Sequence, residues 1–239
     1  MPAAHDHDHD HQHDVDTATD PMAAWRDTDP DLWFTESFWD DRYRDRPIWS
    51  GNANQRLVEA ATDLAPGRAL DVGCGEGGDA IWLAGRGWRV TATDVSTVVL
   101  ARAAQTAAEA GLADRISWEQ ADGLGDWAPT PSAYDLVTVS FLQLPRPELP
   151  RFHRRLAAAV APGGTLLITA HHADSHAGAD TPFTADLFAT ADEMAGGLDL
   201  DDAWEVTATD PTRVAVLAGD PDGQPHTVRD AVVRAVRLR

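Results

Sequence analysis

The 239-residue sequence contains no lysine, so all of its 19 basic side chains are arginines. This absence excludes Schiff-base chemistry and the phosphate-binding lysine of a Walker loop. Positive charge is scarce as well, because 39 acidic residues give a net charge of −20. Nucleic acids and anionic membranes bind to basic surfaces. We therefore expect neither a nucleic-acid partner nor a membrane partner.

Cysteine and long apolar runs are lacking too. The single cysteine, Cys74, cannot form a disulfide within the chain and fits a reducing compartment. No apolar stretch reaches the roughly 18 residues that a membrane-spanning helix needs. The N-terminus lacks the basic flank and apolar core of a signal peptide. We expect a cytoplasmic protein that is a monomer or a homodimer.

Composition predicts three regions along the chain. Residues 1–24 are expected to be a disordered tail, which contains "HDHDHDHQHDVD" from residue 5 onward. The imidazoles of this tail also suit loose binding of a transition metal. Residues 25–66 are expected to form an N-terminal helical lid. In its segment 31–49, Leu32, Phe34, Phe38 and Trp39 follow a roughly helical spacing that Pro47 ends. Residues 67–239 are expected to form the main domain.

Strand-like and helix-like segments alternate from residue 68 onward. Helices are expected from about Gly78 to Arg86, from the cap residue Ser96 to Gly111, and from near Pro150 to "PGG", the last with Val160 on its apolar face. The expected strands are 69–72, 89–93, 116–119, 135–140 and 165–170. This alternation predicts an α/β fold: a doubly wound, mostly parallel, seven-stranded sheet with helices on both faces.

The pattern is less regular after His171. A helix within 181–194 and a strand at 204–209 are expected. "AVVRAVRL" (231–238) is expected to be the last strand, antiparallel and at an edge, although "VAVLA" (214–218) competes for that place.

The segment "LDVGCGEGGDA" (70–80) contains a G-x-G-x-x-G pattern, which often holds the pyrophosphate of a dinucleotide. Three carboxylates lie in or beside the same loop and would repel a pyrophosphate, whereas they would attract a cation such as a sulfonium or an ammonium group. The glycines of the pattern are Gly73, Gly75 and Gly78, and the carboxylates are Asp71, Glu76 and Asp79.

Polar residues follow the other expected strands, at the edge where ligands bind in open parallel sheets. Asp94 lies 21 residues after Gly73, a position from which a carboxylate can bind ribose hydroxyls of either NAD or another adenosine ligand. Asp122 can accept a hydrogen bond from an adenine amino group. The sign of the charges favours S-adenosylmethionine as the cofactor.

The motifs from "ALDVGCGEGGDAIWLAGRGWRVTATDVS" through "QADG", "YDLVTVSFLQLP" and "LAAAVAPGGTLLIT" resemble those of Rossmann-fold S-adenosylmethionine-dependent methyltransferases, in that family's order. The resemblance covers about residues 36–175. It implies S-adenosylmethionine as the cofactor and a small-molecule methyl acceptor as the partner. The cofactor-binding residues that it implies are Asp71, Gly73, Gly75, Asp94 and Asp122. We take their neighbours Cys74, Val95 and Gly123, together with Ser140 at the end of the fourth expected strand, as further candidates for the cofactor site.

Within that superfamily, "WDDRYRDRPIWSGNAN" before the glycine loop is similar to the tellurite-resistance and thiopurine-type enzymes. This likeness implies that Trp49, Gly51 and Asn54 fold over the cofactor. The likeness does not decide the methyl acceptor, which we expect to be a thiol, a chalcogen species, a hydroxyl or an amine.

His171 and His172 end the fifth expected strand, and a histidine is the usual base for deprotonating a hydroxyl or amine acceptor. We take both as candidate catalytic residues and expect strand alternation to turn only one toward the cleft. With Asp174 and His176 they form no established metal-ligand pattern, so no metal site is predicted. The alternatives are a nicotinamide-dependent oxidoreductase and a non-catalytic cofactor- or metal-binding protein.

Overall fold

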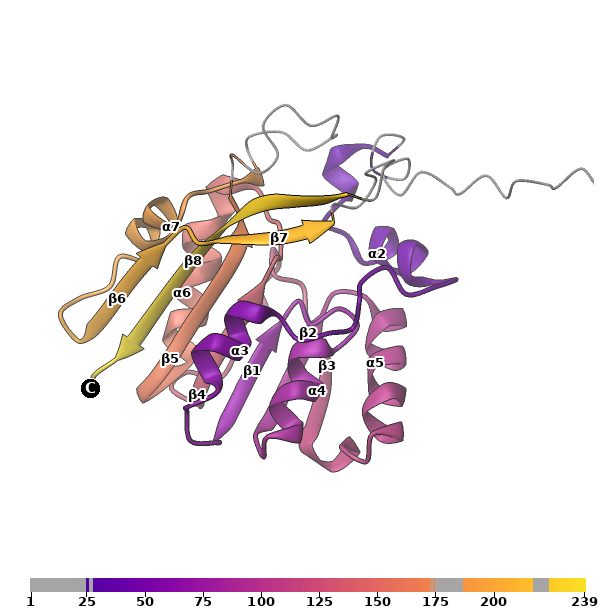
Figure 1. The fold of residues 1–239 in the computed structure, drawn as a ribbon, viewed down its shortest axis with the longest axis horizontal. Helices are drawn as coiled ribbons and strands as arrows, with labels where there is room; N and C mark the ends of the chain where they lie inside the picture. The colour runs from indigo at the N-terminus through magenta and orange to yellow at the C-terminus, as the bar shows by residue number, and fades with distance from the viewer. Residues whose placement is uncertain (1–24, 26–27, 173, 175–186, 217–223) are drawn as a thin grey trace, which may run out of the picture.

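The computed structural model describes residues 25, 28–172, 174, 187–216 and 224–239 (Figure 1). These residues form an eight-stranded sheet with the order β3-β2-β1-β4-β5-β8-β6, in which β7 also pairs with β8. Strands β1 to β5 are parallel to one another, and β8 is antiparallel to β5. The α/β fold and its mostly parallel sheet are confirmed. The first five strands are β1 (Arg68–Val72), β2 (Arg89–Asp94), β3 (Ile116–Gln120), β4 (Tyr134–Ser140) and β5 (Val160–His171).

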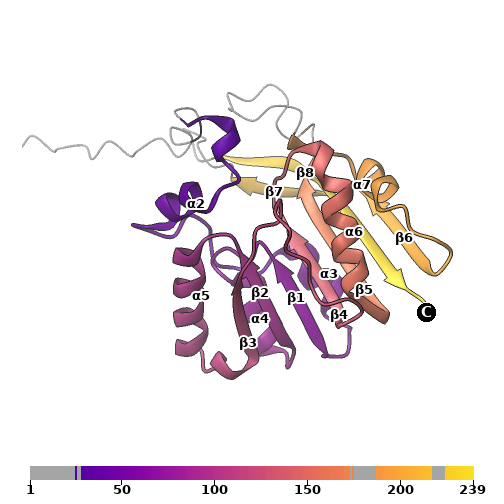
Figure 2. The same ribbon diagram turned by 180° about the vertical axis from the view of Figure 1, so that it is seen from behind.

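Helices cover both faces of this sheet (Figures 1 and 2). Leu57, Leu83 and Ala107 from α3, α4 and α5 share one buried apolar cluster, whereas Phe152 and Met194 from α6 and α7 belong to another. None of the helices among the described residues has the length and apolarity to cross a membrane. The helices are α2 (Glu36–Tyr43), α3 (Gln55–Ala61), α4 (Gly78–Gly85), α5 (Thr97–Glu109), α6 (Leu149–Ala159) and α7 (Ala191–Leu198).

The expected cap at Ser96 is confirmed, since its side chain accepts from the Val99 N–H at the start of α5. The single helical element expected within 31–49 is wrong. A short 3-10 turn, η1 (Pro30–Leu32), comes first, and α2 starts only after Thr35. The Thr35 hydroxyl accepts from the Phe38 N–H and fixes the helix start there.

The C-terminal part of the chain forms one long hairpin from β6 (Trp204–Thr209), β7 (Thr212–Val216) and β8 (Pro225–Arg237). Its pairing keeps one register, with Thr209 opposite Val232 and Thr212 opposite Arg229. Between them lies Pro211, which has no N–H to donate but whose carbonyl still accepts from the Asp230 N–H. In both views β7 and the facing half of β8 run beyond the sheet toward the N-terminal helices (Figures 1 and 2).

This hairpin shows which C-terminal segments form strands. Segment 231–238 lies in the antiparallel β8 up to Arg237, but β8 lies between β5 and β6 and is therefore not the edge that we expected. The competing segment contributes residues 214–216 to β7, and its remainder falls outside the described residues. Val160 begins β5 instead of continuing α6. Helix α7 begins at Ala191 behind a Thr190 capping box, so only the end of the expected helix within 181–194 is helical in the described part.

Candidate cofactor site and acceptor site

The glycine loop leaves the carboxyl end of β1 and crosses directly beneath the N-terminal segment. Gly75 has a φ of +49°, and a Cβ atom there would lie 3.4 Å from both the Tyr43 hydroxyl and the Trp49 ring. At Gly78 a Cβ atom would lie 2.6 Å from the carbonyl oxygen of Asn52, a distance that no side chain tolerates. Glycine is thus required by close packing of the segment against the loop.

Asp94 ties this loop to the end of β2. One of its carboxylate oxygens accepts from the Gly75 N–H at 3.0 Å and the other from the Ser96 N–H at 3.0 Å. Burial raises the pKa of this carboxyl above its ordinary value, and the backbone donors partly offset the shift. A carboxylate offers about four acceptor positions, so these backbone donors do not exhaust its capacity to bind ribose hydroxyls.

The predicted lid residues contact the loop through their backbone and side chains. The Ile48 N–H donates to Glu76 Oε1 at 3.1 Å, and the Asn54 N–H donates to Asp79 Oδ1 at 2.6 Å. Trp49 donates from its indole nitrogen to the Tyr43 hydroxyl at 2.8 Å. Trp49 and Asn54 therefore lie at the loop, whereas their folding over a cofactor stays a prediction. The division into a lid (25–66) and a domain (67–239) stays a prediction.

The three loop carboxylates differ in how fully they are paired. Glu76 lies 3.6 Å from the Arg102 guanidinium, besides accepting from Ile48. Asp79 accepts from the Ser140 hydroxyl at 2.9 Å as well as from Asn54. Asp71 is 2% exposed, and its Oδ2 has no hydrogen-bond partner among the described residues. Asp71 is the one of the three that has an unpaired buried oxygen for a ligand.

The pKa of Asp71 is raised well above its ordinary value, because its carboxyl is buried and faces the negative charges of Asp79 and Asp94. The pKa of Asp79 is raised by burial too. A cation beside Asp71 would favour its ionised form. The same neighbourhood holds a buried donor without a partner, Asn54 Nδ2. One unpaired acceptor and one unpaired donor fit the ammonium and carboxylate of an amino-acid group.

Cys74 lies in the loop, but its thiol is not activated. Burial, followed by the negative charges of Asp71 and Asp94, raises the pKa of this thiol. Because the thiolate is the reactive form, Cys74 is not suited to act as a nucleophile.

A cavity of about 510 Å³ opens at the ends of β2 and β3. Val95 and Asp122, both predicted to contact the cofactor, line it together with Phe34 and Thr35 from the N-terminal segment. Gly123 borders this region, where its carbonyl accepts from the Arg155 guanidinium. A planar base could lie here with the Asp122 carboxylate within reach of an amino group.

The two histidines at the end of β5 lie in different surroundings. The His171 ring stacks on Phe141 with a centroid distance of 4.4 Å and an interplanar angle of 26°. His172 is buried, and its Nδ1 accepts from the Asp174 N–H at 3.1 Å. The other ring nitrogen of His172 lies 3.8 Å from Asp210. Only His171 therefore lies against the residue that follows β4.

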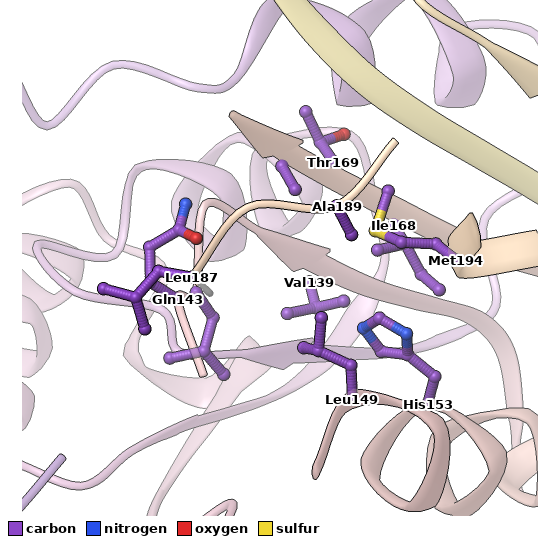
Figure 3. Close-up of a pocket in the computed structure, with 11 residues that line it drawn as sticks. Val139, Gln143, Leu149, His153, Ile168, Thr169, Leu187, Ala189 and Met194 are labelled. Carbon is purple, nitrogen blue, oxygen red and sulfur yellow. The ribbon is translucent and has the colours of Figure 1, made fainter. Parts of the chain in front are cut away.

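A second, much smaller cavity of about 10 Å³ lies between α6, α7 and the ends of β4 and β5. Figure 3 shows His153 and Leu149 extending from α6 toward Val139 and Ile168. Burial lowers the pKa of His153 to about 4, so its ring is neutral at neutral pH. This space is about the size of one water molecule and is too small for a substrate.

Sequence reasoning missed the groups that connect these elements. Tyr43 covers Gly75, Arg102 neutralises Glu76, and Asp40 accepts from the Ser96 hydroxyl at 2.6 Å. Each pair joins segments far apart in the sequence, so no local spacing indicates it. Among the described residues no group of three or more His, Cys, Asp or Glu side chains is arranged to hold a metal ion; the histidine-rich tail and His176 lie outside them.

Residues 69–164 match a family model described as a methyltransferase domain. Over these residues the chain resembles a methyltransferase domain. The sheet that they belong to has five parallel strands and an antiparallel strand, β8, next to β5.

The chain is also similar to curated methyltransferases and to solved structures. The nocamycin O-methyltransferase of Saccharothrix syringae is 31% identical over 183 residues, which are 74% of this chain and 61% of that protein. TehB from Haemophilus influenzae has a TM-score of 0.63 and 23% identity, covering 84% of this chain and 66% of that one. A structure solved in connection with the conversion of a disulfide bond into a thioacetal group during echinomycin biosynthesis has a TM-score of 0.66 and 24% identity. The match covers 84% of this chain and 91% of that one.

The chain spans 33%, 48% and 61% of the lengths of the first three curated relatives that it matches. The structural likenesses, all below 25% identity, concern the fold.

Proposed function

We propose that this protein transfers a methyl group from S-adenosylmethionine to a small molecule. The observation that carries the proposal is the buried, unpaired Oδ2 of Asp71 at the end of β1, beside a glycine loop. A pyrophosphate would meet unfavourable charge there, whereas an ammonium group would supply the missing donor. The methyltransferase family match supports the same cofactor.

The proposed cofactor contacts follow from the geometry above. Asp71 accepts from the ammonium group, and Asn54 Nδ2 donates to the carboxylate. Asp94 binds the ribose hydroxyls with the acceptor positions that Gly75 and Ser96 leave over. The adenine occupies the cavity at Val95 and Asp122. Gly73, Cys74, Gly51, Gly123 and Ser140 shape the surrounding backbone.

When bound, the cofactor supplies an activated methyl group on a sulfonium sulfur. The protein's part is to hold the acceptor in line with that methyl and to exclude water. A thiolate or selenide acceptor needs no base. A hydroxyl or amine must lose a proton, and we propose His171 as the base because it packs on Phe141, directly after Ser140. His172 is the weaker candidate, since it is buried beside Asp174 and Asp210.

A small-molecule acceptor suits this chain better than a nucleic acid, because the net charge of −20 opposes polyanion binding. The relation to a nocamycin O-methyltransferase supports an acceptor oxygen. A cytoplasmic location is part of the proposal and rests on the single cysteine, Cys74.

A product-release assay tests the function. S-adenosylhomocysteine formation is measured with the full chain across thiols, selenite, tellurite, phenols and amines. We expect acceptor-dependent release with at least one class, and loss of it in Asp71→Asn but not in Asp63→Asn, an exposed carboxylate on the loop after α3. Equal release by both variants would contradict the role of Asp71.

A further inference from the structure

A buried ion-pair cluster lies at the carboxyl end of β5, where the β7–β8 hairpin extends beyond the sheet (Figure 1). Asp230 is fully buried and accepts from Arg56 Nε at 3.1 Å. Arg213 Nε contacts both oxygens of the same carboxylate at 3.0 Å. Asp230 is opposite His171 in the pairing of β8 with β5, so the cluster adjoins the candidate base.

The two arginines of this cluster differ in how many donors they use. Arg56 also donates to the Thr212 carbonyl at 3.1 Å and to Glu59 at 3.1 Å, so each of its nitrogens is engaged. Arg213 bonds to Asp230 through Nε, and its two Nη atoms have no partner among the residues that the structure describes. The Arg213 side chain is 23% exposed, so part of it is accessible to a ligand.

The Nη groups of Arg213 lie beside aromatic surface. The Arg213 guanidinium carbon is 5.3 Å from the centroid of the Phe141 ring. Phe141 stacks in turn on His171. Its backbone has a φ of +55°, a strained conformation for this residue type, and strained residues cluster at functional sites. Because Phe141 follows Ser140, which bonds Asp79, this surface adjoins the proposed cofactor loop.

The ion pairs of the cluster are balanced, because Arg56 and Arg213 carry two positive charges and Asp230 and Glu59 carry two negative charges. The donors that remain for an anionic ligand are the Nη atoms of Arg213, which bind an anion through charge-assisted hydrogen bonds. A planar guanidinium with two free N–H groups matches a carboxylate in a bidentate geometry.

We propose that Arg213 and Phe141 select the methyl acceptor, and that the acceptor is a planar aromatic carboxylate; the inference rests on the methyltransferase function proposed above. The two Nη atoms of Arg213 donate to the carboxylate, while the ring of the acceptor packs beside Phe141 and His171. Asp230 holds Arg213 in position through its Nε. Arg213 is thus a specificity residue supplied by the C-terminal hairpin.

The test uses the full chain saturated with S-adenosylhomocysteine and compares binding of benzoate and benzamide by calorimetry or ligand-observed NMR. The two probes have the same ring and differ in charge. We expect benzoate to bind at least tenfold more tightly than benzamide. Arg213→Gln removes that preference and Arg213→Lys retains only part of it. Arg89→Gln removes an exposed arginine at the start of β2, away from the carboxyl ends of the strands, and leaves the preference for benzoate unchanged.

S-adenosylhomocysteine affinity, measured first in each variant, separates the two proposals. If the wild type fails to bind S-adenosylhomocysteine, the proposed function fails. If it binds, the inference is overturned by equal or absent binding of the two probes, or by a benzoate preference that survives in Arg213→Gln. Unchanged S-adenosylhomocysteine affinity in Arg213→Gln shows that this variant is folded. If Arg213→Gln does not fold, the comparison of benzoate with benzamide is made in Arg213→Lys instead.

Discussion

Replacing Asp71 by Asn keeps the shape of the side chain and removes its charge at the one loop carboxylate with an unpaired buried oxygen. A hydrogen bond between charged groups contributes about 1.5–3 kcal/mol, which corresponds to roughly 10- to 150-fold in a dissociation constant. We therefore expect Asp71→Asn to weaken S-adenosylmethionine and S-adenosylhomocysteine by that factor. Isothermal titration calorimetry measures both.

The same substitution has a matched ligand control. Methylthioadenosine carries the adenosine but lacks the amino-acid group, so its affinity should be the same in Asp71→Asn and in the wild type. Equal losses for methylthioadenosine and S-adenosylhomocysteine would show general damage to the site. No loss for either would refute the assignment of Asp71 to the ammonium group.

The pH dependence of binding gives a further check on Asp71. Its pKa is raised by burial and by the negative charges of Asp79 and Asp94, so its protonated form persists above the usual range. Affinity for the cofactor should rise with pH as this carboxyl ionises, and the rise should be smaller in Asp71→Asn. In the ligand-free protein the folded state holds the extra proton. Stability should therefore fall as pH rises from about 4 through the raised pKa, and this decline should be smaller in the variant.

Three other substitutions and conditions test neighbouring features. Asp94→Ala should weaken S-adenosylmethionine by about 1–3 kcal/mol in calorimetry, and unchanged affinity would contradict its assigned role. Gly78→Ala should lower the free energy of unfolding in urea by about 1–3 kcal/mol, because the new methyl overlaps the Asn52 carbonyl. At Gly85 a new methyl would meet nothing within 4 Å, so Gly85→Ala should not lower the free energy of unfolding in this way. Equal losses of stability in the two variants would refute the packing explanation. The pKa of about 4 at His153 lies below the unfolded value of 6.5, so stability should drop by about 2 kcal/mol between pH 7 and 5. A His153→Gln variant that shows the same drop would contradict this origin.

Local patterns were sufficient to predict most of the fold. Helices lie between most of the five parallel strands, and Ser96 marks the start of α5; both were predictable because periodicity and capping act within a few residues. The aromatic segment misled the helix prediction, since Phe34 packs on the core from an irregular stretch before Thr35. Its spacing reflects burial, which does not require a continuous helix.

The positions of Asp71 and Asp94 at strand ends were predictable, but the pairing of charges around them was not. Arg102 neutralises Glu76 across α5 and the loop, and Arg56 reaches Asp230 over a separation of 174 residues. Such contacts depend on which strands become neighbours. The position of β8 between β5 and β6 determines which strands are neighbours, and the sequence of a single strand does not reveal that position.

The most direct measurement of the central claim is a pair of calorimetric titrations of the full chain, one with S-adenosylhomocysteine and one with NADH. Asp71 and its neighbours predict saturable binding of S-adenosylhomocysteine at one site and no detectable heat from NADH. Saturable NADH binding, with none for S-adenosylhomocysteine, would contradict the assignment of this glycine loop to a methyl donor.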